Sequence, residues 1–297
     1  MNKTSFMGDK PVNRMGFGAM QLAGPGVFGP PRDPDAARAV LRRALELGVD
    51  HIDTAQYYGP DVVNDLIRET LHPYPENLKL VTKVGGRRDH RGAWLPAQSP
   101  AELRAGVEDN LRSLQVERMD LVNLRLMDHE APGDLLAEQL GTLEDLRGEG
   151  KLDLIGISEA GVEASRRAFE LVDIAEVQNA YSVVNRSGED VLEMCMEREI
   201  AFVPYFPLGS AFAGGPKQLA QDPVIGGVAQ RHGITATQVA LAWLLSRYQR
   251  MLLIPGTSSV AHLEQNMAAA DIELGESDLA ELESATQLGD PATAAHD

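Results

Sequence analysis

Short apolar runs alternate with longer helix-like segments along the whole chain, and this alternation restricts the fold more than any other feature. Eight runs have the length and composition of β-strands. They are apolar throughout rather than alternating with polar residues, which is typical of parallel strands buried on both faces. The expected strands lie at residues 14–20, 49–53, 78–84, 119–126, 152–158, 174–178, 200–206 and 251–256.

The segments between these runs carry signals for the start of a helix. Asp33 is followed by Pro34, an N-cap and a first-turn proline. Ser99 with Glu102, and Thr235 with Gln238, have the spacing of a capping box. We therefore expect helices to begin at these points between the strands.

Eight such β-then-α units without a linker predict a closed (β/α)8 TIM barrel, formed by residues 1–297 as a single domain. The rival is an open doubly wound sheet. It is disfavoured because Gln21 stands where its phosphate-binding motif would need a third glycine. Turn residues within 5–14 predict an N-terminal hairpin that caps the bottom of the barrel.

Composition excludes several classes of partner. The chain has 27 basic and 44 acidic residues, a formal net charge of −17, which argues against binding nucleic acid or an anionic membrane surface. The single cysteine, Cys195, excludes an intrachain disulfide and a cysteine-cluster metal site, and the histidines form no metal-binding motif. The sequence shows neither a signal peptide nor an apolar run of membrane-spanning length, so a cytoplasmic protein is expected.

Ionisable side chains stand at the ends of three expected strands. Asp53 and Tyr58 follow the second strand, Lys83 ends the third and Arg125 ends the fourth. In a barrel, loops after the strands build the active site. Asp53 and Lys83 could pair there, and a cation beside a phenol lowers the tyrosine pKa from about 10. A tyrosine tuned in this way can exchange a proton with a carbonyl oxygen.

At this point the sequence resembles the aldo-keto reductases over nearly its whole length. The motifs that carry the resemblance occur in the family's order: GVDHIDTAQYYG, VTKVG, GISEA, VQNAYSV, YFPLG and IPGTSSVAHLEQN. The resemblance implies that Tyr58 is the general acid, that Lys83 lowers its pKa, and that Asp53 orients Lys83. Tyr57 has no counterpart in the pattern and is interpreted as packing.

Arg125 departs from the family, which usually has histidine at the end of this strand. Arginine stays charged at physiological pH and only donates hydrogen bonds. It could hold a substrate carbonyl or anion by charge-assisted hydrogen bonds. The alternative is an arginine that pairs with a local acid such as Asp128 and takes no part in catalysis. His129 is interpreted as a surface or pocket-rim residue.

The resemblance also implies a nicotinamide cofactor site. NADPH is expected, and NADH is the weaker alternative because His262 stands where many members have arginine for the 2′-phosphate. Glu159 replaces an asparagine that usually contacts the cofactor. The residues implied in cofactor binding are Met20, Gln21, Asp53, Ser158, Gln178, Tyr205, Leu208, Gly209, Ser210, Gly256, Thr257, Ser258, Ser259, His262, Gln265 and Asn266.

The expected activity is NADPH-dependent reduction of an aldehyde or ketone to an alcohol. Phe28, Tyr58, Trp94 and Arg125 are the expected substrate pocket, and Arg87 with Arg88 could attract an anion. The closest resemblance is to a bacterial branch that reduces pyridoxal to pyridoxine. Two alternatives remain open: a nicotinamide-binding sensor or regulatory subunit with little turnover, and an aldolase that uses Lys83 as a Schiff base.

Overall fold

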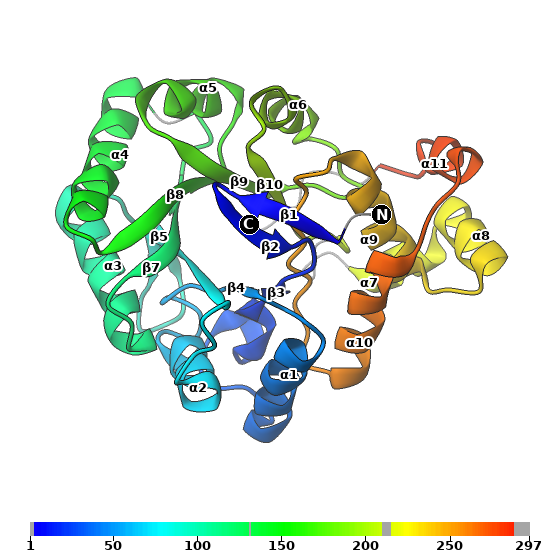
Figure 1. Ribbon diagram of the computed structural model, residues 1–297, viewed down its shortest axis with the longest axis horizontal. Helices are drawn as coiled ribbons and strands as arrows, with labels where there is room; N and C mark the ends of the chain where they lie inside the picture. The colour runs from blue at the N-terminus through cyan, green and yellow to red at the C-terminus, as the bar shows by residue number, and fades with distance from the viewer. Residues whose placement is uncertain (1–2, 131, 210–214, 288–297) are drawn as a thin grey trace.

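A parallel β-sheet curls around the centre of the molecule (Figure 1). The computed structural model describes residues 3–130, 132–209 and 215–287. Within the sheet the parallel neighbours follow the order β10, β9, β8, β7, β5, β4 and β3. The bounds of these strands are Phe17–Gly18 (β3), His51–Asp53 (β4), Lys79–Arg88 (β5), Met119–Arg125 (β7), Leu152–Ser158 (β8), Ile174–Ala180 (β9) and Ala201–Tyr205 (β10).

The last expected strand closes the ring as two isolated bridges rather than as a regular strand. Met251 pairs in parallel with Phe202 of β10, and Leu253 pairs in parallel with Met15 just before β3. Backbone hydrogen bonds accompany both bridges, from Leu252 to Phe202 at 3.0 Å and from Gly16 to Leu253 at 2.7 Å. The predicted (β/α)8 barrel is therefore confirmed.

Helices α1 to α6, α9 and α10 surround the sheet, while α8 and α11 lie outside this ring on one side (Figure 1). Short 3-10 helices are Ala19–Leu22 (η1), Pro25–Val27 (η2) and Ala269–Asp271 (η4). The α-helices are Pro34–Glu46 (α1), Val62–Leu71 (α2), Pro100–Leu114 (α3), Gly133–Gly148 (α4), Val162–Leu171 (α5), Glu189–Arg198 (α6), Pro216–Gln221 (α7), Pro223–His232 (α8), Ala236–Arg247 (α9), Val260–Ala268 (α10) and Glu276–Leu282 (α11).

The helix starts predicted from the sequence are confirmed. The carboxylate of Asp33 accepts hydrogen bonds from two backbone amides in the first turn of α1. Ser99 and Thr235 each form the reciprocal bonds of a capping box, at α3 and α9. These caps satisfy backbone N–H groups that have no partner within the helix, and so fix where each helix begins.

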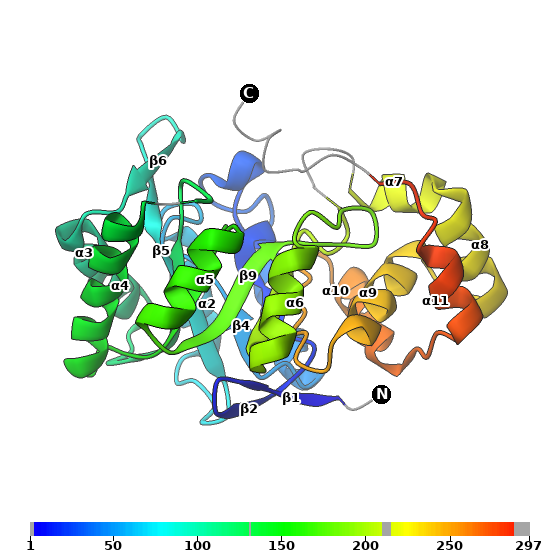
Figure 2. The same ribbon diagram turned by 90° about the horizontal axis from the view of Figure 1, so that it is seen from above.

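An antiparallel hairpin closes the bottom of the barrel. Strands β1 (Thr4–Met7) and β2 (Lys10–Asn13) pair with each other, and Figure 2 shows them at one end of the molecule. Met7 and Val12 of the hairpin are buried against Val81, Leu121 and other inward-facing residues of the parallel strands. Their apolar side chains plug the barrel at this end, as predicted.

A second hairpin, which the sequence did not reveal, rises at the opposite end. Strand β5 runs on to Arg88 and pairs there in antiparallel fashion with β6 (Trp94–Ala97) (Figure 2). This extension carries Trp94 to the rim of the barrel, where the loops after the strands lie.

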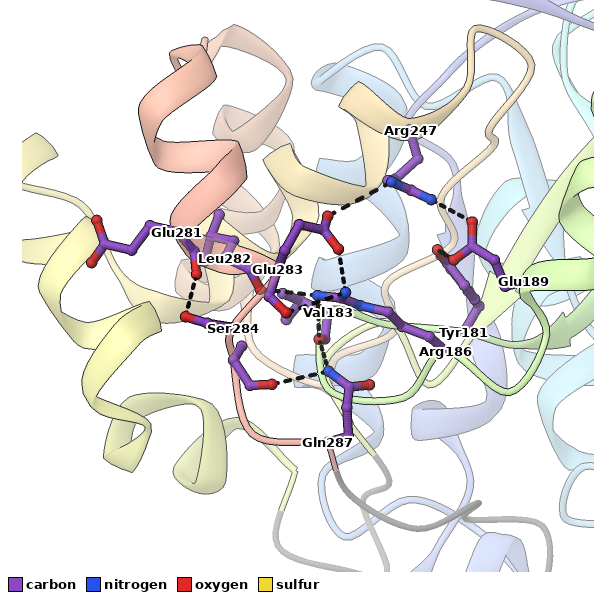
Figure 3. Close-up of polar contacts among 11 residues, drawn as sticks. Tyr181, Val183, Arg186, Glu189, Arg247, Glu281, Leu282, Glu283, Ser284 and Gln287 are labelled. Atoms are coloured by element: carbon purple, nitrogen blue, oxygen red, sulfur yellow. Dashed lines mark hydrogen bonds and ion pairs between the residues drawn. The ribbon is translucent and has the colours of Figure 1, made fainter.

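The end of the described chain is tied to the loop that leaves β9 (Figure 3). Arg186 in this loop forms an ion pair with Glu283 and donates to the carbonyl oxygen of Leu282 at 2.9 Å. Gln287 donates to the carbonyl oxygen of Val183 at 3.1 Å. The loop after β9 is therefore held from its outer side.

Candidate active site

A cavity of about 650 Å³ opens at the carboxyl ends of the parallel strands. This volume is within the range of small-molecule and cofactor sites. Its lining comes from the ends of β4, β5, β7, β8 and β9 and from the loops that follow β3 and β10. The barrel thus gathers at one mouth the residues that the sequence analysis assigned to catalysis.

A buried ion pair forms the floor of this cavity. Lys83 on β5 pairs with Asp53 on the neighbouring strand β4, as expected. Lys83 also donates to the carbonyl oxygen of Thr54 at 3.3 Å, and Asp53 accepts a second hydrogen bond from Gln178 Nε2 at 3.0 Å. All of these side chains are buried, and their pairing offsets the cost of removing two charges from water.

Tyr58 lies beside this pair and lines the cavity. Lys83 Nζ is 5.3 Å from the centre of its ring. Burial, and then the negative charge of Asp53, raise the pKa of the Tyr58 phenol, while Arg125 acts in the lowering direction. The lowering of this pKa by Lys83, which the resemblance implies, stays a prediction, and in this structure burial and the charge of Asp53 dominate. The phenol therefore keeps its proton at neutral pH, as a proton donor must.

Tyr57 packs beside the cavity lining rather than within it. It is 2% exposed, and its ring meets the rings of Tyr58 and Trp94 edge-on, with both centroids at 5.5 Å. Burial raises the pKa of Tyr57 to about 12. Its surroundings agree with the packing role expected from the sequence, although its buried hydroxyl has no hydrogen-bond partner among the described residues.

Arg125 ends β7 and lines the same cavity as Tyr58. Its Nη2 atom lies 3.4 Å from Glu159 Oε1, so its acidic partner is Glu159 and not Asp128. Its guanidinium carbon is 5.4 Å from the centre of the Trp94 ring. Burial by itself would lower the pKa of Arg125, but the neighbouring Tyr57 and Glu159 outweigh this and raise it. The side chain is a permanent cation in the wall of the cavity.

Arg88 contacts the aromatic side chains at the rim of the barrel. Its guanidinium stacks on Trp94 at 4.1 Å and on Phe28 at 5.5 Å, and it donates to the backbone oxygens of Gly26, Val27 and Gly92. Arg88 is thus a structural link between two loops, not a free site for an anion.

Two expected site residues fall outside the cavity lining among the described residues. Phe28 stacks on Arg88, and Val27 lines the cavity in its place. The hydroxyl of Ser259 caps α10 by accepting from the His262 amide at 3.5 Å, so it is turned to the helix. Ser210 lies outside the described residues.

The other expected cofactor residues all line the cavity. Gln178 contacts Asp53 directly, Ser158 and Tyr205 stand at the ends of β8 and β10, and a second group of lining residues comes from Gly256 to Ser258 and from α10. A Cβ atom on Gly256 would come within 2.4 Å of the Gly18 backbone oxygen, so glycine permits this close approach of two chain segments. The remaining expected members of the lining are Met20, Gln21, Leu208, Gly209, His262, Gln265 and Asn266.

Several lining residues were not predicted from the sequence. None of them is ionisable; most lie at the end of an expected strand or in the loop that follows, whereas Pro216 and Thr237 lie in the first turns of α7 and α9. These residues are Gly18, Val27, Met127, Phe206, Pro207, Pro216, Thr237, Ile254 and Pro255.

A buried carboxyl group beneath the floor was also missed. Glu176 on β9 accepts a hydrogen bond from Asn123 Nδ2 at 2.8 Å, inside the barrel. Burial, together with the charge of Asp53, raises the pKa of Glu176 to about 7 against the lowering effect of Asn123. Gly156 makes room for the pair, because a Cβ there would lie 2.1 Å from Asn123 Oδ1.

The described residues contain neither a metal-binding cluster nor a membrane-spanning helix. In the described part of the chain, histidine, cysteine, aspartate and glutamate side chains nowhere gather in threes as metal ligands would. Over the same residues, every helix is too short or too polar to span a bilayer.

Comparison with known proteins decides the family. A sequence model of the Aldo/keto reductase family matches residues 14–287. The chain belongs to this family. Pyridoxine 4-dehydrogenase of Escherichia coli is 47% identical over 285 residues, covering 95% of this chain and 98% of that protein.

Solved structures agree with this assignment. An aldo/keto reductase from Klebsiella pneumoniae in complex with NADP and acetate has a TM-score of 0.78 and 27% identity, with 95% of each chain covered. A Klebsiella pneumoniae aldo-keto reductase in complex with NADPH has a TM-score of 0.79 and 27% identity, covering 95% of this chain and 94% of that one. The protein is therefore an oxidoreductase of carbonyl and alcohol groups that uses a nicotinamide cofactor.

The residues present fit such a cofactor. The cavity runs from a buried polar cluster at the strand ends to glycine, threonine and serine at the start of α10. Backbone amides at the start of a helix are natural partners for phosphate groups. The lining therefore offers hydrogen-bonding groups suited to the amide and the phosphates of a nicotinamide cofactor.

Proposed function

We propose that this protein reduces aldehydes to alcohols with NADPH, that Tyr58 donates the proton, and that pyridoxal is a substrate. The observation that carries the proposal is the phenol of Tyr58, which lines the cavity beside the buried Lys83–Asp53 pair. When bound, NADPH supplies the hydride that reaches the carbonyl carbon.

Tyr58 transfers its phenolic proton to the carbonyl oxygen as negative charge develops there. Its raised pKa keeps the donor protonated before the step. The ammonium group of Lys83, held in place by Asp53, then lies close enough to favour the phenolate that remains. Arg125 faces the same space and donates to the developing oxyanion, a form of charge stabilisation that contributes strongly in a buried site.

Ser158 and Gln178 are the proposed partners of the nicotinamide amide group. Because Gln178 Nε2 already donates to Asp53, its carbonyl oxygen is the atom left to accept from that amide. Tyr205 at the end of β10 provides an aromatic face for the ring.

NADPH is proposed over NADH because of the start of α10. Thr257, Ser258 and His262 line that end of the cavity and offer hydroxyl, backbone and imidazole donors to a 2′-phosphate. Pyridoxal is proposed from the 47% identical pyridoxine 4-dehydrogenase and from a pocket that combines the Trp94 ring with the Arg125 cation.

The test is to mix purified protein with NADPH and a panel of aldehydes that includes pyridoxal, and to follow both the loss of reduced nicotinamide and the formation of alcohol. Turnover of pyridoxal to pyridoxine at a rate above that of simple aliphatic aldehydes is expected. Tight NADPH binding without turnover of any aldehyde would contradict the proposal and favour a sensor role. A covalent adduct at Lys83 trapped by borohydride would favour an aldolase.

A further inference from the structure

The charges at the catalytic end of the cavity are balanced. Among the described lining residues, the acidic, basic and histidine side chains are Asp53, Lys83, Arg125, Glu159 and His262. Lys83 is paired with Asp53, and Arg125 is paired with Glu159. His262 belongs to α10, away from these pairs in the chain. A substrate that enters between Tyr58 and Arg125 therefore meets a cation that already has a carboxylate partner.

Glu159 is held firmly in this position. It follows β8 with a φ of 61°, and its amide donates to the Gln178 carbonyl oxygen at 3.2 Å. His129 Nδ1 lies 2.9 Å from the carbonyl oxygen of Glu159 and, facing an acceptor, must be the donor. The Glu159 side chain is 12% exposed and that of Arg125 is 26% exposed. The pair is thus partly buried, and a partly buried ionic interaction is screened less than one at the surface.

A guanidinium without this neighbour would be a strong site for a substrate carboxylate, because it can donate two parallel hydrogen bonds. Glu159 lowers the affinity of Arg125 for a substrate carboxylate in two ways. It occupies part of the guanidinium at Nη2, and its own negative charge repels a second carboxylate brought to the same place. A neutral carbonyl oxygen needs only a single donor and carries no net charge to be repelled.

We infer that Glu159 is a specificity-determining residue, which makes the site select neutral aldehydes over aldehydes that carry a carboxylate. The inference rests on the proposed function, since it requires the substrate to lie against Arg125. Glu159 acts through Arg125 and is a positioning residue, not a catalytic one.

The test compares two aldehydes of nearly the same shape, para-formylbenzoate and its neutral methyl ester, in wild type and Glu159→Gln. Glutamine keeps the size of the side chain and an accepting oxygen but removes the charge. The ratio of kcat/KM for the acid to that for the ester should rise by about ten-fold, equivalent to one strong charge–charge interaction. The rise should appear chiefly in KM of the acid and shrink at high salt.

The matched control is Glu163→Gln. Glu163 lies in the first turn of α5, close in sequence, but pairs with the surface residue Arg166. Removing its charge should leave the acid-to-ester ratio unchanged. Glu159→Asn is a second variant, because asparagine readily adopts the left-handed backbone conformation found at this position.

Binding of benzoate and benzamide to the NADP-loaded protein, measured by calorimetry, gives a readout without turnover. Glu159→Gln should bind benzoate about ten-fold more tightly and benzamide equally well. Folded variants with unchanged acid-to-ester and benzoate-to-benzamide ratios would overturn the inference. If wild type turns over neither aldehyde, the proposed function fails, and the two binding constants alone then decide the role of Glu159.

Discussion

The two ends of the cavity are built from different chemistry. At the catalytic end, charged side chains on or just after the barrel strands form two ion pairs: the buried Lys83–Asp53 pair and the partly buried Arg125–Glu159 pair. At the far end, Thr257, Ser258 and the first turn of α10 supply mostly uncharged donors, with His262 as the ionisable group.

This difference separates the tasks of the site. Strand ends are fixed by the hydrogen-bonded barrel, so the groups that must meet the reacting atoms are held rigidly. The start of a helix offers donors to an anion without burying a charge. We therefore expect substitutions at the catalytic end to change the rate of the chemical step, and those at the far end to change cofactor affinity.

Tyr58→Phe should have the largest effect on activity. It removes the proposed proton donor and little else, so kcat for aldehyde reduction should fall by about 10³-fold while NADPH affinity is kept. Tyr57→Phe is the matched control from the adjacent position, and its kcat should stay within about threefold because Tyr57 packs beside the lining. Comparable losses in both variants, measured by steady-state kinetics, would contradict the assignment.

Replacing Arg125 should be the next largest effect. Arg125→Leu removes a donor to the developing oxyanion, and kcat should fall by about 10²-fold with KM for NADPH little changed. Circular dichroism would establish that the variant is folded. A folded variant with wild-type kcat would show that Arg125 has only a structural role, as the ion-pair partner of Glu159.

Glu176 beneath the floor should make stability depend on pH. Its pKa is about 7 in the folded protein against an ordinary value of 4.5, so the folded state holds the proton more tightly. The resulting stabilisation is fully present below about pH 4.5 and is lost as pH rises through 7. Urea unfolding of wild type and Glu176→Gln should diverge by up to ~3 kcal/mol between acidic and alkaline pH, with the variant favoured at alkaline pH. A difference that does not vary with pH would mean that Glu176 has an ordinary pKa.

His262→Arg should have the smallest effect on kinetics, because it changes cofactor binding and not the chemical step. Arginine adds a permanent charge near the proposed 2′-phosphate site, so KM for NADPH should fall by roughly five-fold, with kcat and KM for NADH nearly unchanged. An equal improvement for both cofactors would indicate that position 262 contacts another part of the molecule.

The barrel and the Lys83–Asp53 pair could be predicted from the sequence because each depends on a local sequence pattern. The sequence alone shows the apolar runs, the cap residues Asp33 and Ser99, and the positions of Asp53 and Lys83 within neighbouring apolar runs. Once the strands are parallel neighbours, the side chains at their ends must meet.

Other features depend on contacts that the sequence does not encode locally. The raised pKa of Tyr58 results from its depth of burial and from the negative charge of Asp53. The alternative considered for Arg125 was a pair with a nearby acid such as Asp128, but its partner is Glu159, which follows the neighbouring strand β8. The β5–β6 hairpin, which sets Trp94 at the rim, was not predicted although Asp89 and Gly92 have the spacing of a turn, because the four residues of β6 include a proline, which is uncommon in strands.

The central claim is that this cavity brings a hydride donor and an aldehyde together beside Tyr58. It is tested most directly with NADPH that carries deuterium on the transferring face of its nicotinamide, given to the protein with pyridoxal in ordinary water. The account predicts pyridoxine with one deuterium bound to the former aldehyde carbon, formed rapidly by wild type and about 10³-fold more slowly by Tyr58→Phe. Pyridoxine without the label, or equal rates of label transfer in the two proteins, would contradict it.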